Sequence, residues 1–459
     1  MNLLFLQFAN PLSTRAGAGT PQPVFSHAIG VLSAMLEAEG FERRLLTLSD
    51  YQAHRLRQAC EGGGTGRPDH VLVELSPHNV TAAHRTIAEL ARMDMPVTVF
   101  GPYATCKPTE AASIPGVRAL ALGEYGAPLR AYLTALRDGE DAPATRGMWI
   151  HTDSGLVRNR LAPLATDLDA LPWPDRELFG YGAIVADTHE ASFKVGRGCP
   201  MWCAYCVNDW YMELYSRHEA PFVRRRSVTH LLDEIAEVIR TYPRAERIVF
   251  HDHAFAMDVE WLREFRTEYP KRCALPFRCH VRLGKVTAET AALLADAGCQ
   301  VVETHLGSGS RFIREEILSM HLSDARIIDA CRALHHAGLR ITADVFIGAP
   351  YESEITVEET LDLLRTTGVD EVRGRVFYPT PGTRAAELCA ENGWIRVHDD
   401  RCYWARRSVL GMPSMPAEQI DAVAEKLRSL VKRPRSTALR KVLERAIRPR
   451  RSGRFGLGR

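Results

Sequence analysis

Three of the eleven cysteines in this 459-residue chain lie close together in the segment GRGCPMWCAYC, residues 196–206. They follow the spacing Cys199-x3-Cys203-x2-Cys206. Thiolates suit zinc and iron–sulfur clusters, but a structural zinc site closes with four ligands. No second CxxC or CxxH pair follows at the usual distance. The spacing therefore favours a four-iron four-sulfur cluster held by three cysteines, with one iron left open. Gly196 and Gly198 would let the backbone wrap around it.

The segment CPMWCAYC resembles the CxxxCx(aromatic)C motif of radical S-adenosylmethionine (radical SAM) enzymes, with Tyr205 at the aromatic position. The resemblance implies that Cys199, Cys203 and Cys206 hold a 4Fe-4S cluster and that SAM chelates the open iron. One electron then cleaves SAM into methionine and a 5′-deoxyadenosyl radical, which abstracts hydrogen from the substrate. In such enzymes the protein supplies orientation and water exclusion.

The resemblance covers nearly the whole chain. FHDHAFAMD (250–258), THLGSGS (304–310), ADVFIGAPYES (343–353) and FYPTPGT (377–383) resemble strand-end motifs of this family. Gly307 departs from the pattern, since a glutamate is usual there. The residues that the resemblance assigns to cofactor binding are Tyr205, Asp252, Arg282, Ser308, Ile347, Gly348 and Phe377.

The N-terminal part resembles the cobalamin-binding domain found in some radical SAM enzymes. VFGPYAT (99–105), LALGEYGAPLRAYL (120–133) and LPWPDR (171–176) carry this resemblance. The chain lacks the DxHxxG motif that provides a histidine ligand to cobalt, and Phe100-Gly101 stands where a glycine pair is usual. Cobalamin binding therefore stays open at this stage.

The elements that position these residues follow from hydrophobic periodicity. Short apolar runs alternate with helical patterns over residues 1–140, which predicts a parallel, doubly wound (Rossmann-like) domain. We expect a linker at 141–190, a partial (β/α)6 TIM-type radical SAM barrel at 191–390, and a helical region with a basic tail at 391–459. The fold class is α/β.

Polar residues follow several of the expected barrel strands, at the rim where such barrels keep their active sites. His251 and His253 lie on the same side of one strand, but no third metal ligand is evident. Glu303 ends an otherwise apolar run, and a buried carboxylate without a partner is costly, so we expect a cationic or hydroxylated substrate beside it. The catalytic candidates are Glu303, Tyr215, His251 and Asp344.

Two reactions fit the resemblance. The first is dehydration of a 1,2-diol in a paromamine-like amino sugar, as in the radical SAM diol dehydratases of aminoglycoside antibiotic biosynthesis, because acidic rim residues suit a polycation. The alternative is a cobalamin-dependent radical SAM methyltransferase of a natural product. A cluster-bearing scaffold without activity is the non-enzyme reading. The expected partners are a flavodoxin- or ferredoxin-type electron donor and, for the dehydratase, an NADPH-dependent reductase.

Composition sets broader limits. The net charge of +2 gives no overall reason to expect nucleic acid as a partner, although residues 432–459 contain eleven Lys or Arg and one acid. No run of 18 apolar residues predicts a membrane span, and MNLLFLQFANPLS does not resemble a signal peptide. A cytoplasmic location is expected, where cysteines outside the cluster remain reduced.

Overall fold

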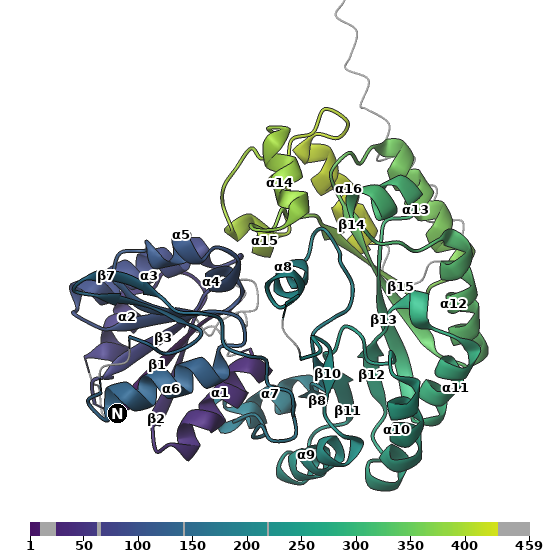
Figure 1. Cartoon of the computed structure of the whole chain (residues 1–459). Helices are drawn as coiled ribbons and strands as arrows, with labels where there is room; N and C mark the ends of the chain where they lie inside the picture. The colour runs from purple at the N-terminus through teal and green to yellow at the C-terminus, as the bar shows by residue number, and fades with distance from the viewer. Residues whose placement is uncertain (10–23, 62–65, 141–142, 218–219, 430–459) are drawn as a thin grey trace, which may run out of the picture.

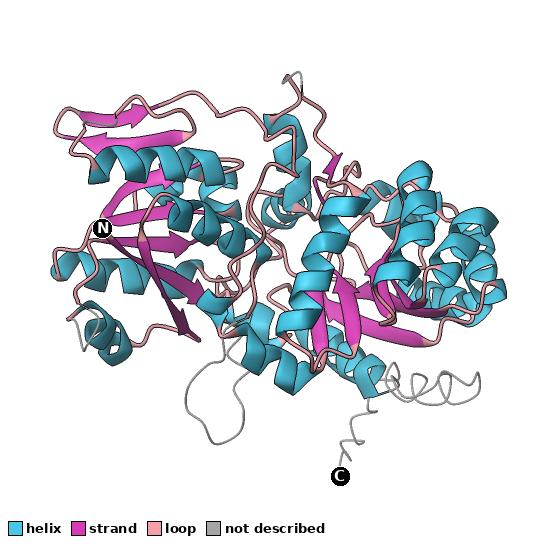
Figure 2. Cartoon of the chain, turned by 90° about the horizontal axis from the view of Figure 1, so that it is seen from below, coloured by secondary structure: helices cyan, strands magenta, loops and turns pink. Residues whose placement is uncertain are grey.

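The computed structural model describes residues 1–9, 24–61, 66–140, 143–217 and 220–429. It contains two α/β parts, each built around its own sheet, with a small helical region at the C-terminal end (Figure 1). Figure 2 shows the strands in two separate groups, with helices on both sides of the N-terminal sheet. The basic tail at 432–459 lies outside the described residues.

The N-terminal sheet has the strand order β2-β1-β3-β4-β5-β6-β7. Its first five strands pair in parallel: β1 (Asn2–Phe8), β2 (Glu42–Leu48), β3 (His70–Glu74), β4 (Val97–Phe100) and β5 (Val117–Ala121). The helices are α1 (His27–Ala38), α2 (Ala53–Cys60), α3 (Val80–Arg92), α4 (Pro102–Cys106), α5 (Pro108–Ala112) and α6 (Gly126–Arg137).

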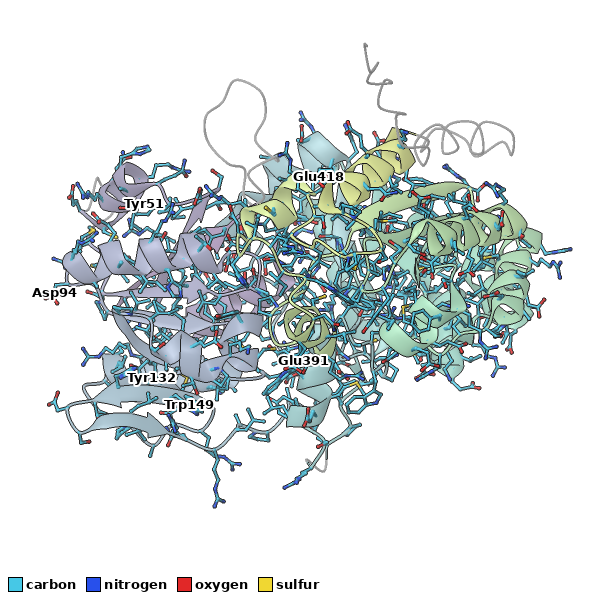
Figure 3. All side chains as sticks on the ribbon, turned by 90° about the horizontal axis from the view of Figure 1, so that it is seen from above. Tyr51, Asp94, Tyr132, Trp149, Glu391 and Glu418 are labelled. Atoms are coloured by element: carbon cyan, nitrogen blue, oxygen red, sulfur yellow. The ribbon has the colours of Figure 1, made fainter. Side chains whose placement is uncertain are left out.

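Alternation along β1 explains why helices cover both faces of this sheet. Leu3 and Phe5 pack with α1 and α6, whereas Leu4 and Leu6 pack with α2 and α3. Successive side chains of a strand point to opposite faces, so the unbroken apolar run of β1 places it in the interior of the sheet. Figure 3 shows Tyr132 of α6 and Trp149 of β6 in this domain, with Glu391 and Glu418 of the C-terminal helices nearer the middle of the molecule.

A hairpin extends the N-terminal sheet into the residues expected to be a linker. Strands β6 (Met148–Thr152) and β7 (Gly155–Arg158) are antiparallel, and β6 pairs with β5. The segment between the hairpin and the barrel contains a 3₁₀ turn (Glu177–Phe179) and α7 (Tyr181–Thr188). The segment that connects the two sheets is therefore shorter than the linker expected at residues 141–190.

The second sheet is a six-stranded, fully parallel partial barrel with β8 and β15 at its edges. Its strands are β8 (Glu190–Phe193), β11 (Arg247–Phe250), β12 (Phe277–His280), β13 (Cys299–Gly307), β14 (Arg340–Ile347) and β15 (Glu371–Val376). The helices between them are α9 (Val228–Thr241), α10 (Val259–Arg272), α11 (Ala288–Asp296), α12 (Asp324–His336) and α13 (Glu354–Thr367). The predicted fold class is confirmed.

Side-chain N-caps begin each of these helices, because Ser, Thr and Asp oxygens accept from backbone N–H groups that lack a helical partner. The capping residues are Ser227, Asp258, Thr287, Ser323 and Ser353. A β-ribbon of β9 (Gly196–Arg197) and β10 (Arg224–Arg225) and helix α8 (Val207–Leu214) flank the three cysteines.

The C-terminal region bridges the two parts of the molecule. It contains α14 (Arg384–Glu391), α15 (Arg401–Ala405) and α16 (Ala417–Ser429). The carboxylate of Asp400 accepts a hydrogen bond from the N–H of Thr81 in the first turn of α3, at 2.8 Å. The indole of Trp404 donates to the carbonyl of His78, and the ring of Tyr403 stacks on His78 with centroids 3.6 Å apart. Over the described part of the chain, the helices all lack the length and apolar character that crossing a membrane requires.

Candidate active site

The three cysteines line a cavity of about 540 Å³ at the carboxyl ends of the barrel strands. Cys199 and Cys203 are buried, and Cys206 is half-buried. Burial raises the pKa of Cys203 to about 11, while the positive charge of Arg282 opposes this. Arg282 lies 3.5 Å from the sulfur of Cys199. A guanidinium beside the thiols favours their thiolate forms, which are the forms that bind metal.

The carboxylate of Asp252 fixes the strand that enters this loop. Its two oxygens accept hydrogen bonds from the backbone N–H groups of Val195, at 2.6 Å, and Gly196, at 2.7 Å. Gly198 has φ +84°, and a Cβ atom there would overlap the carbonyl of Phe222. Asp252 was predicted to bind cofactor, but both its oxygens already serve the backbone of the loop. Its visible role is to position the cysteine segment.

The donor set fits an iron–sulfur cluster. Three thiols face one side of a cavity that continues over the barrel lumen, as a cluster with an open iron requires. Among residues 1–429 with their gaps, no group of three or more His, Cys, Asp or Glu side chains could hold a single metal ion. His251 and His253 both line the cavity, but the described residues give them no third ligand.

Three uncharged histidines, His253, His280 and His305, line the same cavity as the cysteines and are called the histidine layer here. Burial lowers the pKa of His253 to about 4 and of His280 to about 3, and it lowers the pKa of His305 as well. The buried Nδ1 of His280 and Nε2 of His305 have no hydrogen-bond partner in the part of the chain that the structure describes. Neutral imidazoles can both donate and accept hydrogen bonds. The cavity therefore offers unused polar atoms to a polar ligand.

Glu303 and Asp344 are already paired with arginines. This corrects the expectation from the sequence that a cationic substrate would be the partner of Glu303. Glu303 pairs with Arg278, at 2.5 Å, and with Arg373, at 3.1 Å. Burial disfavours ionisation of Glu303, but the two arginines outweigh it and hold its pKa below the usual value. Asp344 pairs with Arg375 at 2.9 Å. The acidic rim is thus largely neutralised by arginines, and the argument for a polycationic substrate loses its main support.

The structure brings together most of the predicted site residues but not all of them. The residues that line the cysteine cavity are Cys199, Cys203, Tyr205, Cys206, His251, Asp252, Arg282, Glu303 and Asp344. Those predicted for the site that do not line it are Tyr215, Ser308, Ile347, Gly348 and Phe377. Ser308 is buried against Thr360, and Phe377 packs in a cluster with Ile347 and Ala204. The roles assigned to these residues remain predictions.

Sequence reasoning missed several cavity residues. Lys194, His280, Arg375 and Tyr403 also line the cavity. His280 is in register with Glu303 on the neighbouring strand. The signal was the alternation along β12, since His280 lies two residues after Arg278, and side chains two apart share a face of a strand.

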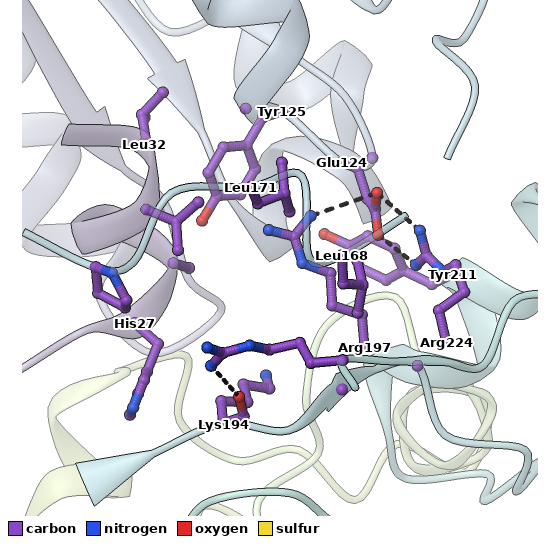
Figure 4. Close-up of a pocket in the computed structure, with 18 of the residues that line it drawn as sticks. His27, Leu32, Glu124, Tyr125, Leu168, Leu171, Lys194, Arg197, Tyr211 and Arg224 are labelled. Atoms are coloured by element: carbon purple, nitrogen blue, oxygen red, sulfur yellow. Dashed lines mark hydrogen bonds and ion pairs between the residues drawn. The ribbon is translucent and has the colours of Figure 1, made fainter. Parts of the chain in front are cut away.

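A second cavity of about 370 Å³ lies between the doubly wound domain and the barrel (Figure 4). On the N-terminal side it is lined by the start of α1, including His27, by Glu74 at the end of β3, and by residues after β5, including Tyr125. The carboxyl ends of parallel strands are where such sheets bind ligands. The Nε2 atom of the half-buried His27 is itself buried and has no hydrogen-bond partner among the described residues, and desolvation lowers the pKa of the ring, so it is uncharged.

Glu124 ties this interdomain cavity to the cysteine loop. It pairs with Arg224 of β10 and, at 3.5 Å, with Arg197 of β9 (Figure 4). Tyr215, predicted as a catalytic residue at the barrel mouth, lines this second cavity instead. Its hydroxyl oxygen accepts from the N–H of Glu124 at 2.9 Å and lies directly over Gly123, where a Cβ atom would overlap it.

The comparisons with known proteins agree with this architecture. The model of the Radical SAM superfamily matches residues 193–364. The match begins at the last residue of β8, includes the three cysteines, and ends within α13. Over these residues the chain is similar to radical SAM enzymes, which use a 4Fe-4S cluster, SAM and an electron donor.

Two relatives are similar over most of the chain, one described as a methyltransferase and the other as a methylthiotransferase. An uncharacterized methyltransferase of Pyrococcus horikoshii is 23% identical over 74% of both chains. A threonylcarbamoyladenosine tRNA methylthiotransferase of Bacillus subtilis is 23% identical over 64% of this chain and 60% of its own length.

Two solved structures share the arrangement of both domains. The radical SAM methyltransferase TsrM of Kitasatospora setae, solved with tryptophan and a SAM analogue, has a TM-score of 0.65, with 18% identity over 88% of this chain and 82% of its own. The cobalamin-dependent radical enzyme OxsB has a TM-score of 0.62, with 17% identity over 79% of this chain and 51% of its own. At these identities the likeness establishes a shared fold.

Proposed function

We propose that the protein is a radical SAM methyltransferase acting on a polar small molecule, with a corrinoid in the interdomain cavity. Cys199, Cys203 and Cys206 would hold the cluster, and SAM would lie in the 540 Å³ cavity beside Arg282. When bound, the cluster and SAM supply an organic radical, and a corrinoid supplies methyl-transfer chemistry. The chain's own residues bind, orient and shield these groups.

One observation carries the proposal. Lys194, Gly196, Arg197, Gly198, Asn208 and Arg224 line both the cysteine cavity and the interdomain cavity. A group at the strand ends of the doubly wound domain would therefore lie next to one bound by the cysteines. The unpartnered Nε2 of His27 and the apolar side chains of Leu32, Leu168 and Leu171 suit a large organic ligand with polar edges.

Diol dehydration of an amino sugar, the first reading of the sequence, becomes the second candidate. The relatives described as methyltransferases favour the alternative. One observation still favours a reaction without corrinoid: the phenol of Tyr215 fills the space over Gly123, at the end of β5, where a nucleotide tail would approach the sheet. Under that reading the barrel cavity alone holds the reactants, and an NADPH-dependent reductase would act on the product.

Corrinoid binding separates the two candidates. The reconstituted protein is incubated with hydroxocobalamin, separated from free ligand by gel filtration, and its visible spectrum recorded. Stoichiometric binding, lost in Val31→Trp because indole would fill the cavity that Val31 lines, supports methyl transfer. Absence of binding together with 5′-deoxyadenosine production from SAM and reductant would favour dehydration. Release of 5′-deoxyadenosine by wild type and its loss in Cys203→Ala test the radical chemistry common to both.

A further inference from the structure

A third cavity, of about 350 Å³, lies in the barrel lumen at the end opposite the cysteines. Glu190, Arg247, Phe277 and Glu371 are the first residues of β8, β11, β12 and β15, and all four line it. Arg340, the exposed first residue of β14, lines it as well. This cavity therefore opens toward the amino ends of the strands, away from the cluster loop.

Glu303 lines both this lower cavity and the cysteine cavity. It sits in a series of ion pairs that crosses the lumen from one edge strand to the other. Glu190 of β8 pairs with Arg278 of β12 at 2.9 Å, and Arg278 pairs with Glu303 of β13. Arg373 of β15 pairs with Glu303 and with Glu371, at 3.2 Å. The series thus crosses the barrel lumen by way of β12 and β13.

The position of these ion pairs in the lumen is more informative about their role than their contribution to stability. The side chains of Arg278, Glu303 and Arg373 retain 28%, 21% and 35% of their exposure. Pairs that remain in contact with water contribute only about 0–1 kcal/mol each. A stability role alone does not explain why charged groups fill the lumen of a barrel, where apolar side chains would pack without desolvation cost.

We infer that these ion pairs form the floor of the reaction cavity and block small solutes that enter from the amino end of the barrel. Glu303, Arg278 and Arg373 act as positioning residues, since they close the space below the histidine layer. This inference rests on the proposed radical chemistry. The six-stranded sheet is open between β8 and β15, so closure has to come from side chains.

A solute that passed the floor would react with the 5′-deoxyadenosyl radical in a defined way. One electron and one SAM give methionine and a 5′-deoxyadenosyl radical. If a thiol from solution reaches that radical, its S–H bond breaks, the hydrogen atom forms a C–H bond of 5′-deoxyadenosine, and a thiyl radical remains. In D₂O the thiol carries deuterium, so the 5′-deoxyadenosine gains one deuterium. Without such a donor, the radical can add back to the methionine sulfur, which re-forms SAM and returns the one electron to the reductant.

The test omits substrate. Wild type, Glu303→Gln and Arg373→Met are reconstituted and incubated in D₂O with SAM, dithionite and increasing dithiothreitol. Both variants should form deuterated 5′-deoxyadenosine faster than wild type, on the order of tenfold, with a steeper dependence on thiol, since a closed site suppresses side reactions. Arg247→Gln is the matched control: its side chain lines the same cavity and pairs with Glu190, but not with Glu303.

The outcomes are distinct. Equal rates in wild type and both variants, at equal iron content and thermal stability, overturn the floor and leave the proposed radical chemistry intact. An increase in Glu303→Gln but not in Arg373→Met also overturns it, because a floor of ion pairs needs both partners. If wild type and variants all form no 5′-deoxyadenosine, the proposed function is wrong, and so is the inference about the floor, which rests on it. If Glu303→Gln does not fold, Glu303→Asp and Arg373→Met provide the comparison.

Discussion

Replacement of Asp252 should loosen the loop that carries the cysteines. Its carboxylate accepts two backbone N–H groups, from Val195 and Gly196. A hydrogen bond to a charged group contributes about 1.5–3 kcal/mol, and a buried donor left without a partner costs a comparable amount. Burial also raises the pKa of Asp252, so removing the charge returns part of the loss.

We therefore expect Asp252→Asn to lower the free energy of unfolding by about 2 kcal/mol and Asp252→Ala by about 3 kcal/mol. The amide of Asn can accept one of the two hydrogen bonds, but its NH₂ group faces the second donor. The loss is measured by urea unfolding of the cluster-free protein. Iron content and visible absorption after anaerobic reconstitution report the effect on the cluster, which should fall in the same order.

A surface carboxylate provides the control. Asp296 pairs with Arg266 at 3.1 Å and is about half exposed, so Asp296→Asn should change stability by less than about 0.5 kcal/mol. If Asp252→Asn matches that control in both unfolding free energy and iron content, the carboxylate does not hold the loop and the reasoning is wrong.

Three further predictions follow from other sites. Cys203→Ala should abolish iron binding, whereas Cys389→Ala, a buried cysteine outside the loop, should keep both iron and visible absorption. Gly123→Ala should lower the free energy of unfolding by about 1–3 kcal/mol, because the added Cβ would overlap the Tyr215 hydroxyl and Gly123 has φ +65°. The control Gly126→Ala, within helix α6, should lower it little. Equal unfolding curves for the two variants would refute the overlap. Burial raises the pKa of Glu352 to about 8, so its contribution to stability is full below its unfolded pKa, near 4.3, and declines as pH rises through 8. The difference in unfolding free energy between wild type and Glu352→Gln should decline over that window, and a constant difference would contradict it.

Local patterns in the sequence account for most of the fold and for the cysteine loop. Apolar runs such as Leu3–Leu6 marked buried strands, because a parallel strand covered on both faces needs no polar alternation. The hairpin at 148–158 was missed although MWIHT and GLVR flank the turn-forming Asp153-Ser154. Short edge strands give a weak signal, and the nearby prolines favoured a linker.

Partners of the polar site residues could not be read from the sequence. Glu303 has Arg278 and Arg373 as partners, and they lie 25 and 70 residues away. Their proximity depends on the order and register of three strands, which one sequence does not specify. The direction of Tyr215 was missed for a similar reason: helix α8 leaves the cluster loop toward the other domain, and only tertiary packing decides which cavity its side chains enter.

The bond between Asp400 and Thr81 joins residues 319 positions apart in the chain. Asn79, at the start of α3, makes no side-chain capping bond to that helix. The carboxylate of Asp400, which is synthesised much later, accepts a hydrogen bond from one of the helix's first N–H groups instead. During synthesis, the amino-terminal sheet would emerge from the ribosome long before this carboxylate exists. This contact between the two halves can therefore form only after the segment leading into α15 has been synthesised.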